Sequence, residues 1–144
     1  MHPKYEEDRN SWIVNNIALL KEKKFKEVDV EHLIEELDMA NKSDKRELSS
    51  RLGVLIGHLL KLQFQPDYEV KKSWISTILR ERFELIDLLE ESPSLKSQIV
   101  ERFPKAYKRA LAIIEKETPI DLKVLPKECP YTLEQCLDEE FYPE

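Results

Sequence analysis

Apolar residues recur at helical spacing in five stretches of the chain, and the clearest stretch runs from Asn41 or Ser43 to Gln65. Its leucines alternate at intervals of four and three residues, and other apolar residues widen the stripe until most of the helix surface is apolar. A residue before proline is pushed out of the α region, so the helix is predicted to end before Pro66. Such an apolar helix is predicted to be central. Its leucines are Leu48, Leu52, Leu55, Leu59 and Leu62.

Two helices are predicted before this central one. The first covers about residues 5–24, with an inward face made of Trp12, Ile13, Ile17, Leu19 and Leu20. The second begins after an N-cap at Asp29 and reaches about Ala40. Its apolar residues form one stripe, which is predicted to be buried while the polar residues beside it point outward. The stripe consists of Val30, Leu33, Ile34 and Leu37, and the outward residues include Glu31, His32 and Glu35.

Two more helices are predicted after Pro66, over about residues 69–91 and 93–118. Pro104 lies inside the second of these, where it removes a helical hydrogen bond, so this helix is predicted to kink or to split in two. The remaining segment, 119–144, is acidic and contains prolines. It is predicted to wrap over the outside of the bundle with one short helix, because Thr132 and Gln135 have the spacing of a capping box.

The composition supports an all-α fold in a single compact domain over residues 1–144. The chain is 41% hydrophobic and 36% charged, and it has only two glycines. The tight turns of sheet proteins and the loops that bind phosphate require glycine at several positions, and two glycines are too few for either. Gly53 and Gly57 instead lie four residues apart on one flank of the central helix, where they are predicted to let another helix approach closely.

No apolar run approaches the roughly 20 residues that a membrane helix needs, and the first ten residues are too polar for a secretory signal. We therefore expect a cytoplasmic protein without a membrane partner. The net charge is −6, and both ends of the chain are acidic. Long-range repulsion from phosphates disfavours a general nucleic-acid binder.

Several short motifs of the sequence resemble those of a known family. They are YEED with Trp12, DVEHLIEEL, RELSSRL, HLLK before Pro66, Ser73-Trp74, Ile78 with Arg82, ESPSL and ECPYTLEQCLDEEFYP. In order and extent they resemble the bacterial family named domain of unknown function twenty-nine, which implies an all-α fold and assigns no activity. Around the fourth helix the family form is richer in aromatic and arginine residues, whereas this chain has Val70, Leu79 and Phe83.

Arg82 is the most informative polar residue in the sequence. On a helical wheel it falls near the middle of an apolar stripe, where an unpaired guanidinium would be costly to bury. Glu36 and Glu35 are the candidate carboxylate partners; His58 could join the same network, and Gln63 also needs a partner. The network is either a structural ion pair that fixes helix docking or a polar pocket that binds an anion or an acidic side chain.

Basic residues could form a nucleic-acid patch if they meet in the fold. They are Lys42, Lys45, Arg46 and Arg51 on the central helix and Lys105, Lys108 and Arg109 after Pro104. Acidic residues are interleaved with most of them, as on an ordinary solvated helix surface, so this function is disfavoured.

Catalytic, metal and cofactor signals are weak. The three histidines lack the Glu-x-x-His pairs of a di-iron bundle, and the serines lie in helical stretches without a nucleophile elbow. Cys129 and Cys136 fit neither a metal knuckle nor a disulfide framework and are predicted to be free thiols. We expect no cofactor, and the leading hypothesis is a non-catalytic module that binds another protein, in one form as an inhibitor or antitoxin.

Overall fold

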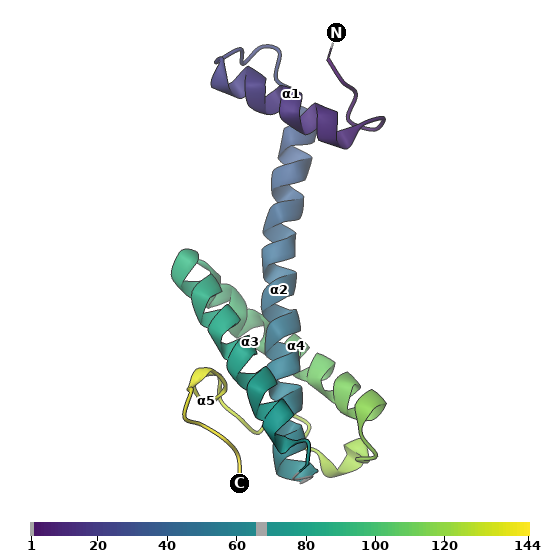
Figure 1. The fold of residues 1–144 in the computed structure, drawn as a ribbon, viewed down its shortest axis with the longest axis vertical. Helices are drawn as coiled ribbons and strands as arrows, with labels where there is room; N and C mark the ends of the chain where they lie inside the picture. Colours follow the sequence, from purple (N-terminus) through teal and green to yellow (C-terminus); the bar gives the residue numbers. More distant parts are fainter. Residues whose placement is uncertain (1, 66–68) are drawn as a thin grey trace. The chain divides into compact units, whose positions relative to one another are not determined.

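The computed structural model describes residues 2–65 and 69–144, and every regular element within these ranges is helical (Figure 1). The predicted all-α fold class is therefore confirmed. The four longer helices are α1 (Arg9–Lys21), α2 (Val30–Phe64), α3 (Lys71–Glu91) and α4 (Leu95–Glu117). A 3-10 turn, η1 (Leu122–Val124), and a short helix, α5 (Leu133–Leu137), follow. None of the described helices has both the length and the apolar character that a bilayer span requires. Helix α2 ends at Phe64, one residue before the predicted end at Gln65, and Pro66 itself lies outside the described residues.

The predicted boundary between the second and the central helix is wrong, because α2 continues from Val30 to Phe64. Asn41 and Ser43, the predicted caps of the central helix, both lie inside α2 and are exposed. A residue can cap only where the following N–H groups lack partners, and within a continuous helix the preceding carbonyls already accept from them. Neither glycine nor proline interrupts residues 30–52.

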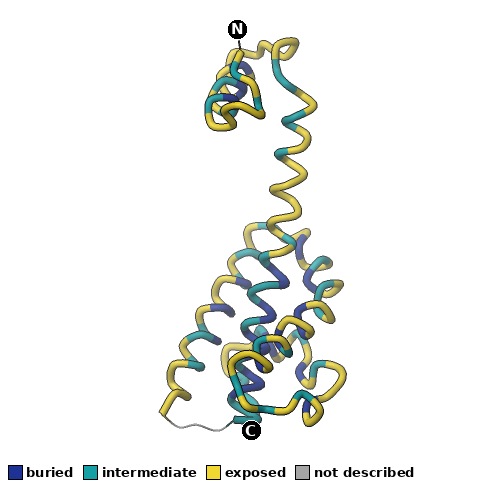
Figure 2. The backbone as a smooth tube through the Cα atoms, turned by 90° about the vertical axis from the view of Figure 1, so that its right-hand side faces the viewer, coloured by how far each residue is buried: buried dark blue, intermediate teal, exposed yellow. Residues whose placement is uncertain are grey.

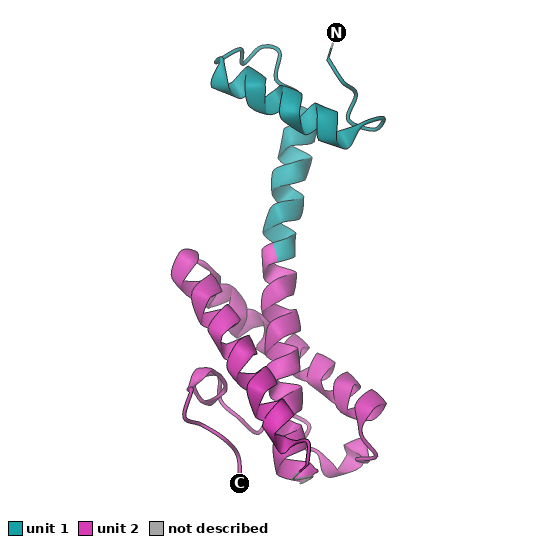
Figure 3. Ribbon diagram, in the orientation of Figure 1, with its two compact units in different colours: residues 1–43 teal, residues 44–144 magenta. Residues whose placement is uncertain are grey.

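The chain forms two compact units, residues 1–43 (unit 1) and residues 44–144 (unit 2) (Figure 3). Helix α2 contributes its first part to unit 1 and its remainder to unit 2. Unit 1 also contains α1, and unit 2 contains all later elements. Whether residues 1–144 behave as a single domain depends on how the two units behave together, so the single domain stays a prediction.

Unit 2 has a closed apolar core around the second part of α2. Leu48, Leu52, Leu55 and Leu59 are fully buried there, as the leucine spacing predicted. Ile78 and Leu85 from α3 and Ile99, Ala110 and Ile114 from α4 join the same cluster. Removing this much apolar surface from water is the main driving force for folding this unit.

Helix α4 approaches α2 closely at both glycines, as predicted. A Cβ atom at Gly53 would lie 3.0 Å from the side chain of Arg109, and one at Gly57 would lie 3.5 Å from Ile113. The first distance is tighter than most contacts, so the Arg109 side chain would have to shift by a few tenths of an ångström to admit a side chain at position 53, whereas the second is an ordinary van der Waals contact. Helix α4 passes through Pro104 without ending, which excludes the predicted split.

Residues 119–144 pack on the core of unit 2 through Leu125, Tyr131 and Cys136. Two tyrosines fix this segment: the Tyr107 hydroxyl donates to the carbonyl of Pro126 at 2.5 Å, and the Tyr131 hydroxyl donates to Gln63 Oε1 at 2.6 Å. The predicted capping box is present, with Thr132 and Gln135 each accepting from the other's backbone N–H. The segment is thus anchored by directed hydrogen bonds as well as by apolar contacts.

Candidate functional site

Polar contacts join α1 to the beginning of α2 within unit 1. Asn16 is buried; its amide donates to the carbonyl of Trp12 at 2.9 Å, and its Oδ1 accepts from the backbone N–H of Asp29 at 2.9 Å. The Trp12 indole donates to Asp29 Oδ2, also at 2.9 Å. Asp29 Oδ1 accepts from the N–H of His32, so the predicted N-cap is confirmed. One aspartate thereby caps α2 and holds α1.

Charged groups extend this contact along α2. Glu36 accepts two hydrogen bonds from Arg9, at 2.7 and 2.5 Å, and one from the Tyr5 hydroxyl at 2.5 Å. The Arg9 bond, followed by the Tyr5 bond, lowers the pKa of Glu36 to about 2. His32 lies 2.7 Å from Asp29 Oδ2, and this contact raises the pKa of His32. His32 was predicted to point outward, but it is half-buried and its ring lies against Tyr5.

The face of α2 that meets α1 is therefore not its apolar stripe. Asp29, His32, Leu33 and Glu36 form the contact face, and all but Leu33 are polar. The stripe predicted to be buried begins at Val30, one residue after Asp29. One residue corresponds to a rotation of about 100° about the helix axis, so the stripe points in a different direction from the contact face. Of its members, Val30, Ile34 and Leu37 are 55%, 60% and 64% exposed. Polar partners on α1 decide which face docks, and most of the apolar stripe is left in solvent.

Helix α1 leaves apolar residues outside in the same way. Trp12 and Leu19 are buried as predicted, but Ile17 and Leu20 are exposed. Ile17, Leu20 and half-buried Ile13 line one wall of a shallow groove of about 200 Å³, and Leu33 of α2 lines the other. Helical geometry places Leu37, Val30 and Ile34 successively beyond Leu33 on that side. We call this continuous surface the unit 1 apolar surface; it comprises Ile13, Ile17, Leu20, Val30, Leu33, Ile34 and Leu37.

Carboxylates border the unit 1 apolar surface on α2. Glu31, Glu35 and Asp38 are exposed and lie beyond the apolar stripe on the side away from α1 (Figure 2 shows the exposure along this helix). Residues 1–43 together contain seven Lys and Arg against ten Asp and Glu. An apolar surface with one acidic border is complementary to an apolar surface with a basic border.

Arg82 is buried as predicted, with 0% of its surface exposed, but its partners are not carboxylates. Its Nε donates to the carbonyl of Cys136 at 2.7 Å, and its Nη2 donates to the carbonyls of Phe141 at 2.8 Å and Gln135 at 3.3 Å. The Tyr142 ring lies 5.3 Å from the guanidinium carbon. Burial lowers the pKa of Arg82. The side chain thus anchors the C-terminal segment to α3.

The other residues of the predicted network have separate partners. Glu36 belongs to the Arg9 and Tyr5 cluster of unit 1, and Glu35 is exposed. His58 bonds to the carbonyl of Val54 in its own helix at 2.8 Å, and Gln63 accepts from Tyr131. The expected Arg82 and glutamate pairing is therefore not formed. Peptide carbonyls, not a carboxylate, accept the hydrogen bonds of Arg82. A helical wheel of α3 alone does not reveal such acceptors.

The predicted basic residues are differently placed. Arg51 lies among three carboxylates, at 2.9 Å from Glu47, 3.2 Å from Glu81 and 3.8 Å from Glu84. The aliphatic part of Arg109 packs on Gly53. Lys42 falls in unit 1, whereas the others fall in unit 2, where Lys45 is half-buried. The exposed members are Lys42, Arg46, Lys105, Lys108 and Arg109.

Within the described part of the chain, no group of three or more His, Cys, Asp or Glu is arranged to hold a metal ion. A family model covers residues 4–142, nearly the whole chain, and its description is "Domain of unknown function DUF29". The chain belongs to this family. No curated protein and no solved structure matches this DUF29 chain. The family confirms the resemblance found in the sequence words and leaves the function of its members open.

Proposed function

We propose that this DUF29 protein binds another protein through the unit 1 apolar surface. The observation that carries the proposal is where exposed apolar side chains gather. Among the described residues, twelve large hydrophobic side chains are exposed, and eight of them belong to residues 14–39. Single exposed hydrophobic residues need no explanation, but a contiguous apolar surface marks an interaction site.

The size of unit 1 supports the same function. A unit of 43 residues buries a smaller fraction of its surface than a larger domain does, and a unit this close to about 40 residues is marginally stable by its own core. Among its described residues, only Trp12 and Leu19 are buried apolar side chains. A partner that covers Ile34 and Leu37 would supply the missing burial. A helix that lies in the groove between α1 and α2 would use a known recognition mode for amphipathic helices.

The acidic border indicates the chemistry of the partner. Glu31, Glu35 and Asp38 favour a partner with Lys or Arg beside its apolar residues, and they also accelerate encounter with it. The inhibitor or antitoxin form of this function, in which an acidic helical protein masks a basic protein surface, is one instance. In an antiparallel pair of two copies the acidic borders would face each other, and this juxtaposition of like charges disfavours that assembly.

Two other functions have less support. Arg51 does not support nucleic-acid binding, because its charge is already neutralised by three nearby carboxylates. Anion binding at Arg82 would require access to a side chain that is fully buried and already donates to three carbonyls.

The test compares two matched double variants of the full chain. Ile34→Ser with Leu37→Ser changes the unit 1 apolar surface, while Phe83→Ser with Val100→Ser changes residues of unit 2 with similar exposure. Each exposed substitution should alter stability by less than about 0.5 kcal/mol. Affinity capture from lysates of the native host should recover a stoichiometric protein with the wild type and the unit 2 variant, and lose it with the unit 1 variant. Equal recovery by all three, or recovery that nuclease treatment abolishes, would contradict the proposal.

A further inference from the structure

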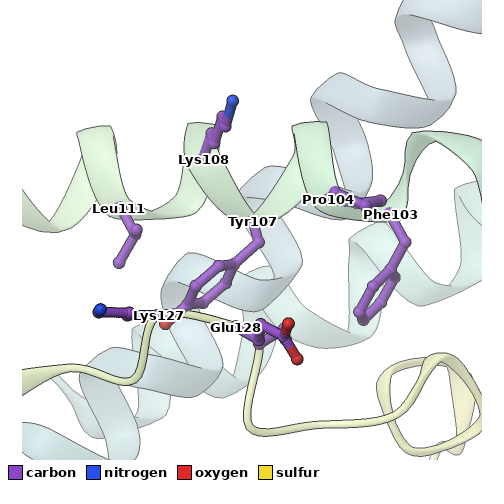
Figure 4. A pocket seen from close by; sticks show the side chains of 8 residues that line it. Phe103, Pro104, Tyr107, Lys108, Leu111, Lys127 and Glu128 are labelled. Atoms are coloured by element: carbon purple, nitrogen blue, oxygen red, sulfur yellow. The ribbon is translucent and has the colours of Figure 1, made fainter.

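A cleft of about 420 Å³ lies in unit 2 between α4 and the segment that follows Pro126 (Figure 4). Its volume falls within the range of roughly 300–1,000 Å³ that is usual for small-molecule sites. Helix α4 forms one wall, and residues 127–129 form the other. Both cysteines of the chain are free thiols, as predicted, and Cys129 is the one that lines the cleft. The lining residues on α4 are Phe103, Pro104, Tyr107, Lys108 and Leu111.

The middle of the cleft is apolar, and a buried aromatic ring fixes its shape. Tyr107 is 4% exposed, and its hydroxyl donates to the carbonyl of Pro126 at 2.5 Å. This bond uses the hydroxyl donor, so the ring contributes an apolar surface. Phe103 and Leu111 lie one turn before and one turn after Tyr107 on α4, and both are half-buried. Over these three residues the apolar wall extends about 12 Å along the helix axis.

Opposite charges stand toward the two ends of this apolar wall. Figure 4 shows Lys127 near Leu111, with its side chain extending away from Glu128. Glu128 lies on the other side of Tyr107, toward Phe103. Both charged residues are exposed, and within the described part of the chain neither forms an ion pair. The two charges therefore remain available to a ligand.

The charges of the cleft indicate the chemistry of its ligand. An apolar anion would meet Lys127 but also Glu128, and an apolar cation would meet the same two charges with the opposite balance. A ligand with one charge of each sign at opposite ends avoids both contacts between like charges. The third charged residue of the lining, Lys108, belongs to neither end, since Figure 4 shows its side chain leaving α4 on the side away from residues 127–128.

We propose that this cleft binds a small ω-amino carboxylate, which is an alkyl chain with a carboxylate at one end and an ammonium at the other. The carboxylate lies at Lys127, the ammonium lies at Glu128, and the methylene chain between them covers the Tyr107 ring. Complete burial of one methylene tightens binding about fourfold. Each exposed ion pair contributes up to about fivefold. The site belongs to unit 2, so it is independent of the unit 1 apolar surface and of the protein partner proposed for that surface.

NMR titration of the wild-type full chain with ω-aminooctanoate is the first measurement. The methyl resonances of Leu111 should shift on binding, and those of Leu55, which is fully buried in the core, should not. Two length-matched analogues remove one charge each: ω-acetamido-octanoate has no ammonium, and ω-aminooctanamide has no carboxylate. Each should bind roughly twofold to fivefold more weakly than ω-aminooctanoate. No Leu111 shift at millimolar ligand, or equal or tighter binding of either analogue, would overturn the proposal.

Charge reversals at the two ends distinguish this site from general weak binding. Lys127→Glu leaves two acidic ends, so the preference should pass to octanediamine, and Glu128→Lys leaves two basic ends, so it should pass to octanedioate. The double variant again has one end of each sign and should prefer ω-aminooctanoate. Lys108→Glu is the matched control and should keep the wild-type order of ligands. All three residues are exposed, so these changes should leave the fold intact. An unchanged order in either single reversal, or a changed order in the control, would overturn the assignment of the two ends.

Discussion

Unit 1 and unit 2 solve the problem of burial in different ways. Of the twenty buried apolar residues in the described ranges, eighteen belong to unit 2, where they form one cluster. Among the described residues of unit 1 only Trp12 and Leu19 are buried apolar residues; its helices are held together by hydrogen bonds that Trp12 and Arg9 donate to Asp29 and Glu36 and by one that Asn16 accepts from the Asp29 N–H. Apolar burial supplies the driving force for folding, while a polar network chiefly fixes one geometry. Unit 2 is thus a closed core, and unit 1 is an oriented pair of helices with an open apolar surface.

The largest expected effect is in the core of unit 2. Leu55→Ala removes a fully buried side chain and should lower the free energy of unfolding by about 2–5 kcal/mol, since it leaves a cavity. Leu37→Ala removes the same atoms from unit 1, where the side chain is mostly in solvent, and should cost less than about 0.5 kcal/mol. Urea denaturation measures both. Similar losses would show that Leu37 is as buried as Leu55 and would end the distinction between the units.

Removal of the Arg82 guanidinium should have the next largest effect. Arg82→Met leaves the carbonyls of Gln135, Cys136 and Phe141 without this donor, and the loss should be about 3 kcal/mol. Arg80→Met, on the exposed side of the same helix, is the control and should be nearly neutral. Limited proteolysis should cut residues 119–144 faster only in the Arg82 variant. A stable Arg82→Met protein with an intact C-terminal segment would show that this anchor is dispensable.

The polar network of unit 1 should respond more weakly. Asn16→Ala removes the bonds to the Trp12 carbonyl and to the Asp29 N–H, so unit 1 should lose about 1–2 kcal/mol. Asn10→Ala on the exposed surface of α1 is the matched control. Hydrogen exchange should accelerate in residues 9–40 and stay unchanged in the core of unit 2. Faster exchange throughout the chain would mean that the two units unfold as one.

The smallest expected effect is a pH response of opposite sign in the two units. The hydrogen bond to Asp29 raises the pKa of His32 above 6.5, so its contribution to unit 1 is full below 6.5 and is lost as the pH rises through the folded pKa. Burial lowers the pKa of His58 below 6.5, so its contribution to unit 2 is full above 6.5 and is lost as the pH falls. Histidine titration by NMR, with hydrogen exchange corrected for intrinsic rates, measures both. Shifts in the same direction would contradict the assignment.

Helical periodicity predicted the core of unit 2 because apolar contacts decide its packing. The leucine stripe of α2, the burial of Arg82 and the close approach at Gly53 all follow from spacing and side-chain size. The same reasoning failed for Ile34 and Leu37. There, the hydrogen bonds of Asp29, His32 and Glu36 determine which face of α2 docks on α1. These polar residues have the same spacing of three and four as the apolar stripe, but each lies one position earlier in the sequence.

Partners distant in the sequence were the other part that could not be predicted. Arg82 donates to carbonyls more than fifty residues away. Peptide carbonyls carry no sequence signature, so the sequence indicates only carboxylates as partners for Arg82. The sequence does contain a signal for the docking face of unit 1: polar residues recur at helical spacing at positions 29, 32 and 36, and Trp12 and Asn16 are available as their partners.

Hydrogen exchange of the full chain, with and without the protein recovered by affinity capture, tests most directly whether unit 1 is the binding region. The account predicts that binding slows exchange in α1 and in residues 30–40 of α2, because the partner covers the unit 1 apolar surface, and that amides of residues 48–62 in the core of unit 2 keep their rates. Slowed exchange confined to residues 44–144, with residues 9–40 unchanged, would contradict it.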